Sequence, residues 1–131
     1  MTDISKTIEQ LEGQVWPLDT YPTHVVQESQ RLRRVPLRDL TVEDLRLLVS
    51  QGIGLNLLVP LALEVLAKNA LAEGQFYPGD LLVSVLNVPA EFWSAHPKLN
   101  NDLVDLAPAL KSVQDLLMTE VLPKLGTFQY K

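Results

Sequence analysis

The feature that most constrains the fold is a long, almost uncharged run near the middle of the chain. Between Ile53 and Ala67 the only ionisable side chain is Glu64, and Asn56 is the only other polar residue. A helix that is apolar nearly all round is normally buried on most of its faces. The run is too short for a membrane span, which needs about 20 mainly apolar residues. We therefore expect a buried central helix over about residues 56–68 of a soluble domain, and no association with a membrane.

The remaining segments predict an all-α fold. The chain has 131 residues, of which 47% are hydrophobic and 21% charged, a composition typical of one globular domain. Apolar residues recur at helical spacing outside the central run as well. We expect a single compact domain over residues 1–131, with about six or seven helices packed around the central one. The expected helices begin near Ile4 (with a stop at Gly13), Thr23, Thr41, Asn56, Asp80 and Leu99, and Pro108 divides or kinks the last.

The acidic charge balance and the absence of cysteine exclude several kinds of site. The chain has 16 Asp and Glu residues against 11 Lys and Arg, a formal charge of −5. This balance argues against a general nucleic-acid binder and favours a basic partner or plain solubility. Without cysteine the chain forms no disulfide and no thiolate metal site. Residues 1–14 contain no apolar signal-peptide core, so we expect a cytoplasmic protein.

Two local signals mark helix starts. The Thr41 side chain can cap the amide of Asp44, and Asp44 can reach back, which makes a capping box with Asp in place of Glu. Pro78 and Gly79 suit the middle of a type II turn, after which Asp80 can cap a short helix. All of these residues are therefore interpreted as structural.

Two short segments allow more than one structure. The β-rich residues 82–88 could form a strand, but no partner strand is evident nearby, so a helix is favoured. Pro89 is expected to begin a turn that carries Phe92 and Trp93 and that Pro97 closes.

Several motifs along the chain form a recognisable combination. They are Leu32-Arg33-Arg34-x-Pro36-Leu37, the run from Glu43 to Glu64 with Leu58-Val59-Pro60-Leu61-Ala62-Leu63-Glu64 at its end, Phe76-Tyr77-Pro78-Gly79-Asp80-Leu81-Leu82, and Pro89-x-x-Phe92-Trp93. In these motifs the chain resembles the immunity proteins of contact-dependent growth inhibition systems. The resemblance covers roughly residues 11–99, whereas the last 30 or so residues match only as helical filler.

The resemblance implies a cytoplasmic bacterial protein that neutralises the toxic C-terminal domain of a delivered effector, often a nuclease. It implies no catalysis and no cofactor. The motif residues look like scaffold residues, so the specificity for one toxin is expected elsewhere on the surface. The alternative is a helical adaptor or homo-oligomer without a toxin-neutralising role, and the sequence leaves the oligomeric state open.

No catalytic or metal-binding constellation is evident. His24 and His96 are far apart in sequence and lack ligand spacing to each other or to an acid. The glycines of Gly52-Ile53-Gly54 do not follow a strand and lack the further glycine or lysine of a phosphate-binding loop. A small enzyme built on Asp80 and Glu64 is a third hypothesis, and a helix cap is favoured for Asp80.

Charged residues within apolar or mixed segments are expected to pair. Glu64 in its apolar helix needs a partner, and Arg46 on the preceding helix is the first candidate, with Arg33 or Arg34 next. The basic cluster is interleaved with acids, which favours a salt-bridged face over a phosphate-binding patch. The cluster consists of Arg31, Arg33, Arg34 and Arg38, and the acids are Glu28, Asp39, Glu43 and Asp44.

The other acids are candidates for contact with a basic toxin. Such residues could steer the encounter and occupy the ground of substrate phosphates, although solvation of the surface is the plainer role for any one of them. Aromatic anchors such as Trp16 or Tyr21 could add hot spots, but burial in the core is favoured for Trp16. The candidate toxin-binding acids are Glu9, Glu12, Asp19, Asp102, Asp105 and Asp115.

Overall fold

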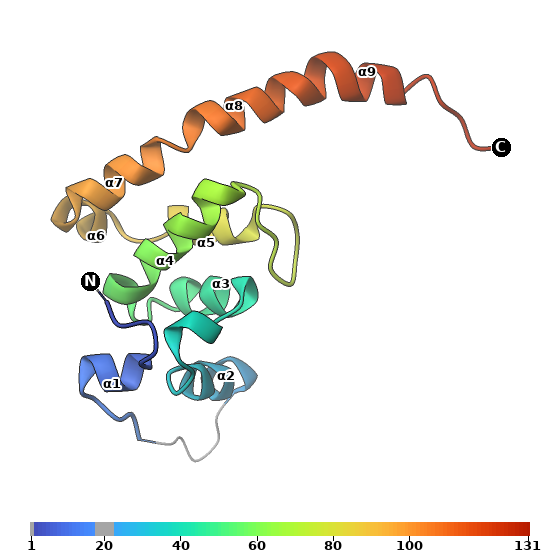
Figure 1. The fold of residues 1–131 in the computed structure, drawn as a ribbon. Helices are drawn as coiled ribbons and strands as arrows, with labels where there is room; N and C mark the ends of the chain where they lie inside the picture. Colours follow the sequence, from blue (N-terminus) through green and yellow to red (C-terminus); the bar gives the residue numbers. More distant parts are fainter. Residues whose placement is uncertain (1, 18–22) are drawn as a thin grey trace.

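The computed structural model describes residues 2–17 and 23–131, and over these residues the fold is all-α, as the sequence predicts. No strand occurs among the described residues. The helices, labelled in Figure 1, are α1 (Ile8–Glu12), α2 (His24–Leu32), η1 (Leu37–Asp39), α3 (Val42–Ser50), α4 (Leu55–Lys68), α5 (Asp80–Leu86), α6 (Ala90–Ala95), α7 (Pro97–Val104), α8 (Ala107–Leu116), the π-helical turn η2 (Leu117–Val121) and α9 (Leu122–Leu125).

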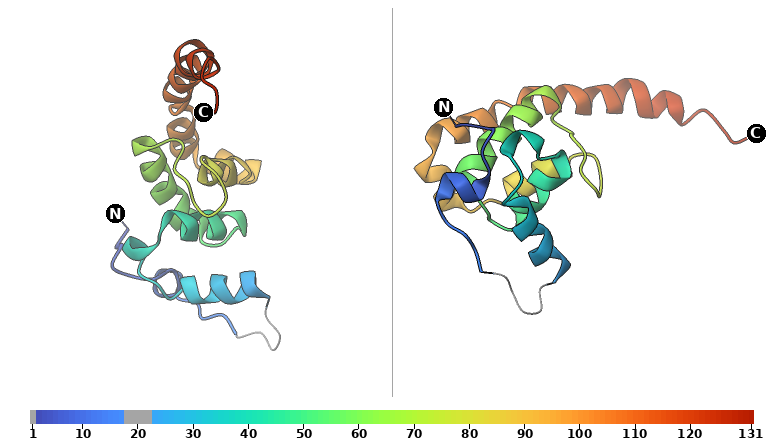
Figure 2. Two further views of the ribbon diagram at one scale, coloured as in Figure 1. Left: turned by 90° about the vertical axis from the view of Figure 1, so that its right-hand side faces the viewer. Right: turned by 60° about the horizontal axis from the view of Figure 1, so that its bottom comes forward.

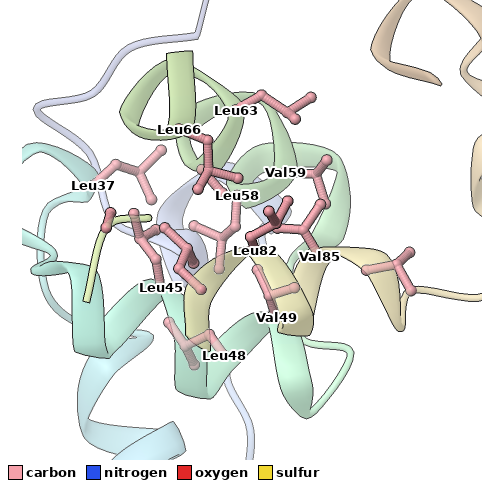
Figure 3. Packing of buried hydrophobic residues seen from close by; sticks show 14 of the residues in the cluster. Leu37, Leu45, Leu48, Val49, Leu58, Val59, Leu63, Leu66, Leu82 and Val85 are labelled. Carbon is pink, nitrogen blue, oxygen red and sulfur yellow. The ribbon is translucent and has the colours of Figure 1, made fainter. Parts of the chain in front are cut away.

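The core lies where α4 meets α3 and α5, and its side chains are shown in Figure 3. One side of α4 is fully buried because its apolar residues recur every three or four positions, which is the spacing of one helix face. The buried side chains of these three helices are Leu58, Val59, Ala62, Leu63 and Leu66 of α4, Leu45, Leu48 and Val49 of α3, and Leu81, Leu82 and Val85 of α5.

The central helix is less enclosed than its composition predicts. It begins at Leu55, close to the expected start, but Glu64 is exposed, as are Ala67 and Lys68. On the same outer side Leu61 and Val65 are only partly buried. The expectation of burial on most faces is therefore wrong for this side, because no other described helix covers it completely.

The local start signals are present as expected. The Thr41 hydroxyl accepts a hydrogen bond from the Asp44 amide at 3.1 Å, and the Asp44 carboxylate accepts one from the Thr41 amide at 3.0 Å. Thr23 caps α2 without a reciprocal bond, by accepting a hydrogen bond from the Val26 amide at 3.2 Å. The ambiguous residues after Gly79 form helix α5, so the helical interpretation is confirmed.

Two expectations need correction. The first helix contains only five residues, because Thr7 caps its start and Gly13 ends it with a left-handed φ of 67°. Ile4 lies before this helix and is exposed, so its periodic spacing did not reflect a helical face. The segment after Pro89, expected as a turn, is the short helix α6.

The C-terminal helices leave the body of the molecule, as Figures 1 and 2 show. The chain divides before Pro108, which sits in the first turn of α8, where its missing N–H removes no helical hydrogen bond. Pro123 lies in the same place in α9, directly after the π-helical turn η2. Leu106 is buried, whereas every residue from Gln114 onward is exposed.

Candidate functional site on the outer face of α4

The incompletely covered side of α4 lies between two hollows. The first, of about 540 Å³, separates α4 from α7 and the start of α8; the second, of about 400 Å³, separates α4 from η1 and α3. Glu64 and Lys68 line both. We call the first hollow the α7 groove; its residues are Pro60, Leu63, Glu64, Leu66, Ala67, Lys68, Ala70, Lys98, Leu99, Asp102, Asp105, Leu106 and Ala109.

Three carboxylates and two lysines line the α7 groove around its apolar floor. Asp102 accepts a hydrogen bond from Lys98 at 3.0 Å, in a pair that is largely open to water. Within the described residues, neither Glu64 nor Asp105 forms an ion pair or a side-chain hydrogen bond, and both are exposed. The structure thus brings together two of the acids singled out from the sequence, Asp102 and Asp105, and adds Glu64.

The expected pair between Glu64 and Arg46 is wrong. Arg46 instead binds Glu43, one turn earlier on α3, with a 3.0 Å contact between its Nε and the second carboxylate oxygen. Glu64 points outward, so water solvates its charge and no partner is required. The sequence prediction failed here because it placed Glu64 on one of the faces of α4 that were expected to be buried.

The N-terminal acids are engaged within the molecule. Glu12 accepts a 2.6 Å hydrogen bond from Arg33, whose side chain is 1% exposed, and Arg33 also donates to the Gln14 carbonyl at 3.2 Å. The guanidinium carbon of Arg33 lies 4.0 Å from the centroid of the Trp16 ring. Trp16 is only partly buried, and it shields this charge instead of filling the core. Glu9 pairs with Arg34 at 3.2 Å.

The remaining members of the expected sets are more scattered. Asp115 is exposed on α8, while Asp19 and Tyr21 lie outside the described residues. Arg31 pairs with Glu28 at 2.8 Å. Together with the pairs of Arg33 and Arg34, this supports the interpretation of the basic cluster as a salt-bridged face.

Asp80 organises the loop before α5 rather than capping that helix. Its buried carboxylate accepts backbone hydrogen bonds from Gly74 at 2.6 Å, Phe76 at 3.0 Å and Tyr77 at 3.5 Å. Burial alone would raise the pKa of this carboxyl, but the backbone amides that bind its charged form together hold the pKa below its ordinary value. The expected capping role is therefore corrected.

The neighbouring turn has the expected geometry. Gly79 has φ 93° and ψ 1°, as the third position of a type II turn requires, and the Asp80 amide closes the turn onto the Tyr77 carbonyl at 3.1 Å. Because the φ is positive, glycine is strongly preferred at this position.

The loop before α5, residues 73–79, is called the Asp80 loop below. Glu43 fixes it from α3 by accepting the Gln75 amide at 3.3 Å, and Arg46 lies over the Phe76 ring at 4.6 Å. The loop presents Phe76, 63% exposed, and Tyr77, 48% exposed. In the sequence, the spacing of Glu43 and Arg46 on α3 indicates that these two side chains could pair. It does not indicate that the pair would hold the Asp80 loop.

His96 and Asp80, two side chains capable of acid–base chemistry, have contacts within the molecule. Among the described residues no group of three or more His, Asp or Glu side chains could hold a metal ion. His96 contacts the Phe92 carbonyl at 2.8 Å and stacks on the Phe92 ring. The Asp80 carboxylate is occupied by backbone amides, and Asp80 lines neither hollow beside Glu64.

A membrane-spanning element is also not found: over residues 2–17 and 23–131, each helix is too short or too polar to cross a bilayer.

Comparison with known proteins gives one match. A family model described as CDI immunity proteins matches residues 10–103, which run from α1 to α7 and include the α4 face and the Asp80 loop. Searches of curated proteins and of solved structures found no match.

Proposed function

This chain belongs to the family of CDI immunity proteins, and from that premise we propose that it binds and neutralises the toxic C-terminal domain of one contact-dependent growth inhibition effector. The match over residues 10–103 is the observation that carries the proposal. We further propose that the toxin is a nuclease with a basic substrate-binding surface, that neutralisation takes place in the cytoplasm, and that it requires binding without catalysis.

The proposed contact surface is the outer face of α4 together with the Asp80 loop that follows it. Partly buried apolar residues such as Leu61 and Val65 lie there beside exposed charged groups, which is the composition of many protein interfaces. The chain leads from α4 directly to this loop, and Asn69 and Ala72, which precede the loop, line the second hollow beside α4.

Charge and shape have separate tasks on this surface. Glu64, Asp102 and Asp105 would attract a basic toxin and occupy positions that its substrate phosphates would otherwise take, and the chain's charge of −5 adds to this attraction. Phe76 and Tyr77 would supply anchors that are already ordered by the Asp80 carboxylate, so that little conformational entropy is lost on binding. An interface of standard size, about 1,600 Å² in total, would cover the toxin's active site or substrate surface.

The structure alters the choice among the acids considered from the sequence. Glu9 and Glu12 form ion pairs with Arg34 and Arg33, so we assign them to the attachment of the N-terminal helix. Asp115 is exposed on α8 beyond the residues that line the α7 groove, so we leave it out of the proposed surface.

Co-expression with the toxin domain encoded beside this chain tests the function. The wild-type chain should restore growth, co-purify with the toxin domain and suppress its cleavage of RNA or DNA. Glu64→Lys combined with Asp105→Lys should weaken all three effects, whereas Glu28→Lys combined with Glu91→Lys, on α2 and α6 outside both hollows, changes the net charge equally and serves as the control. Growth that is not restored by the wild-type chain would overturn the proposal and favour a helical adaptor.

A further inference from the structure

The C-terminal arm, defined as residues 107–125, carries a group of exposed large apolar side chains. Figure 1 and Figure 2 show it leaving the body of the molecule. Its large apolar side chains from Leu116 onward are each more than one third exposed, and soluble proteins seldom leave such a patch open unless another molecule covers it. These side chains are Leu116, Leu117, Met118, Val121, Leu122 and Leu125.

One line of apolar residues runs from the core out along the arm. It begins at the buried Leu106 and continues through Leu110 and Val113, which are partly buried. Beyond the body it continues through Leu117, Val121 and Leu125. Four residues exceed one α-helical turn, so a repeated spacing of four would drift around the helix. A π-helix has more residues per turn than an α-helix. The π-helical turn η2 therefore reduces this drift between Leu117 and Val121, which are four residues apart.

The part of the line from Val113 to Val121 is symmetric about Leu117. Val113 and Val121 lie four residues before and after it. In an antiparallel pair of arms, Val113 of each copy would therefore face Val121 of the other, and Leu117 would face Leu117. A two-fold interface requires this self-complementarity.

The charges of the arm favour a second copy over a basic toxin. The arm carries Lys111 and Lys124 against Asp115 and Glu120, so its formal charge is zero, and Lys124 pairs with Glu120 on the same helix at 2.7 Å. Two neutral arms do not repel each other, although the whole chain has a charge of −5. A neutral arm also offers a basic toxin no electrostatic attraction. In addition, the arm lies beyond the residues matched by the family model.

We propose that two copies of this chain form a homodimer through antiparallel pairing of their C-terminal arms about Leu117. Stable interfaces of standard size take about 20–30 residues from each partner. One face of the arm supplies only part of that number, and the exposed Phe128 and Tyr130 of the tail can add to it. This inference goes beyond the neutralisation of a toxin and does not depend on it.

Light scattering after size-exclusion chromatography of the full chain tests the dimer. The wild-type protein at about 100 μM should have twice the 14.6 kDa mass of one chain, and Leu117→Glu should reduce it to the monomer with an unchanged helical circular dichroism signal. Leu86→Glu, at an exposed leucine of α5 outside the arm, is the matched control and should remain dimeric. A monomeric wild-type protein would overturn the proposal.

Disulfide trapping distinguishes antiparallel from parallel pairing, since the chain has no cysteine of its own. A mixture of Val113→Cys and Val121→Cys chains should form a mixed disulfide-linked dimer on mild oxidation, while each variant alone should cross-link poorly. Efficient cross-linking of Val113→Cys with itself would show parallel arms and contradict the proposed arrangement. If the wild-type chain is monomeric and Leu117→Glu abolishes co-purification with the toxin domain, the toxin covers the arm instead.

Discussion

Arg33, at the end of α2, donates a 2.6 Å hydrogen bond to Glu12, at the end of α1, and does so from a position where its side chain is 1% exposed. This contact joins segments separated by 21 positions in the sequence. A buried guanidinium requires such a partner, because an uncompensated charge away from water is strongly unfavourable. The pair therefore fixes the N-terminal helix to the rest of the body.

Glu12→Gln should lower the free energy of unfolding by about 2 kcal/mol, below the 3–5 kcal/mol typical of breaking a buried pair, because the Glu12 carboxylate is partly exposed. Urea denaturation at pH 7 measures the change. Glu28→Gln removes the exposed partner of Arg31 and should cost less than about 1 kcal/mol. If Glu12→Gln and Glu28→Gln lowered the free energy of unfolding equally, the structural role of Arg33 would be contradicted.

Asp80→Asn should lower the free energy of unfolding at pH 7 by about 2–3 kcal/mol, since a neutral amide replaces a carboxylate that accepts three backbone hydrogen bonds. The folded-state pKa of Asp80 is depressed, so its stabilising effect is complete above the unfolded-state pKa, near pH 4, and is lost as the pH falls through the folded-state pKa. The difference between wild type and variant should thus narrow below about pH 4. Urea titrations at pH 7 and pH 3 test this. If the two proteins differ in unfolding free energy by the same amount at both pH values, the depressed pKa of Asp80 is not the cause.

Glu64→Gln should change the free energy of unfolding by less than about 0.5 kcal/mol, because Glu64 is exposed and forms no ion pair within the described residues. The same substitution should weaken toxin binding about two- to five-fold, which corresponds to the energy of an exposed charge contact. Thermal melting and calorimetric titration separate these two effects. A clear loss of stability would restore the hypothesis of a buried, paired carboxylate.

Association with the toxin should slow roughly tenfold when the salt concentration rises from about 0.05 M to about 0.5 M, because screening shortens the range of the carboxylates around the α7 groove. Stopped-flow mixing measures the association rate. Asp102→Asn combined with Asp105→Asn should reduce this salt dependence while leaving the dissociation rate nearly unchanged. A rate insensitive to salt would exclude electrostatic steering.

Phe76→Ala should raise the dissociation rate of the toxin complex about tenfold, as expected for an aromatic anchor at an interface. Its effect on folding should remain below about 1 kcal/mol, since the ring is 63% exposed in the free protein. Surface plasmon resonance provides the rate, and Phe128→Ala at the exposed tail is the matched control. Equal dissociation rates for the wild type and Phe76→Ala would remove the Asp80 loop from the proposed surface.

Local signals in the sequence predicted much of the fold. The rest could not be predicted because it depends on contacts between residues that are distant in sequence. The Thr41 cap and the turn at Gly79 depend on residues within a few positions, so their structure follows from their order. Arg46 pairs with Glu43 and not with Glu64 because of the way α4 is oriented. Hydrophobicity alone does not specify that orientation. Likewise, the spacing of Leu117, Val121 and Leu125 predicts an apolar helix face but not that the body leaves it uncovered.

The interior of the body is complete at Leu106, the last buried residue of the chain. Substitutions farther along therefore escape the packing constraints that restrict α3, α4 and α5, and they can accumulate without unfolding the part that the family shares. The arm that we propose as the dimer contact is thus free to change while the fold of the body is kept.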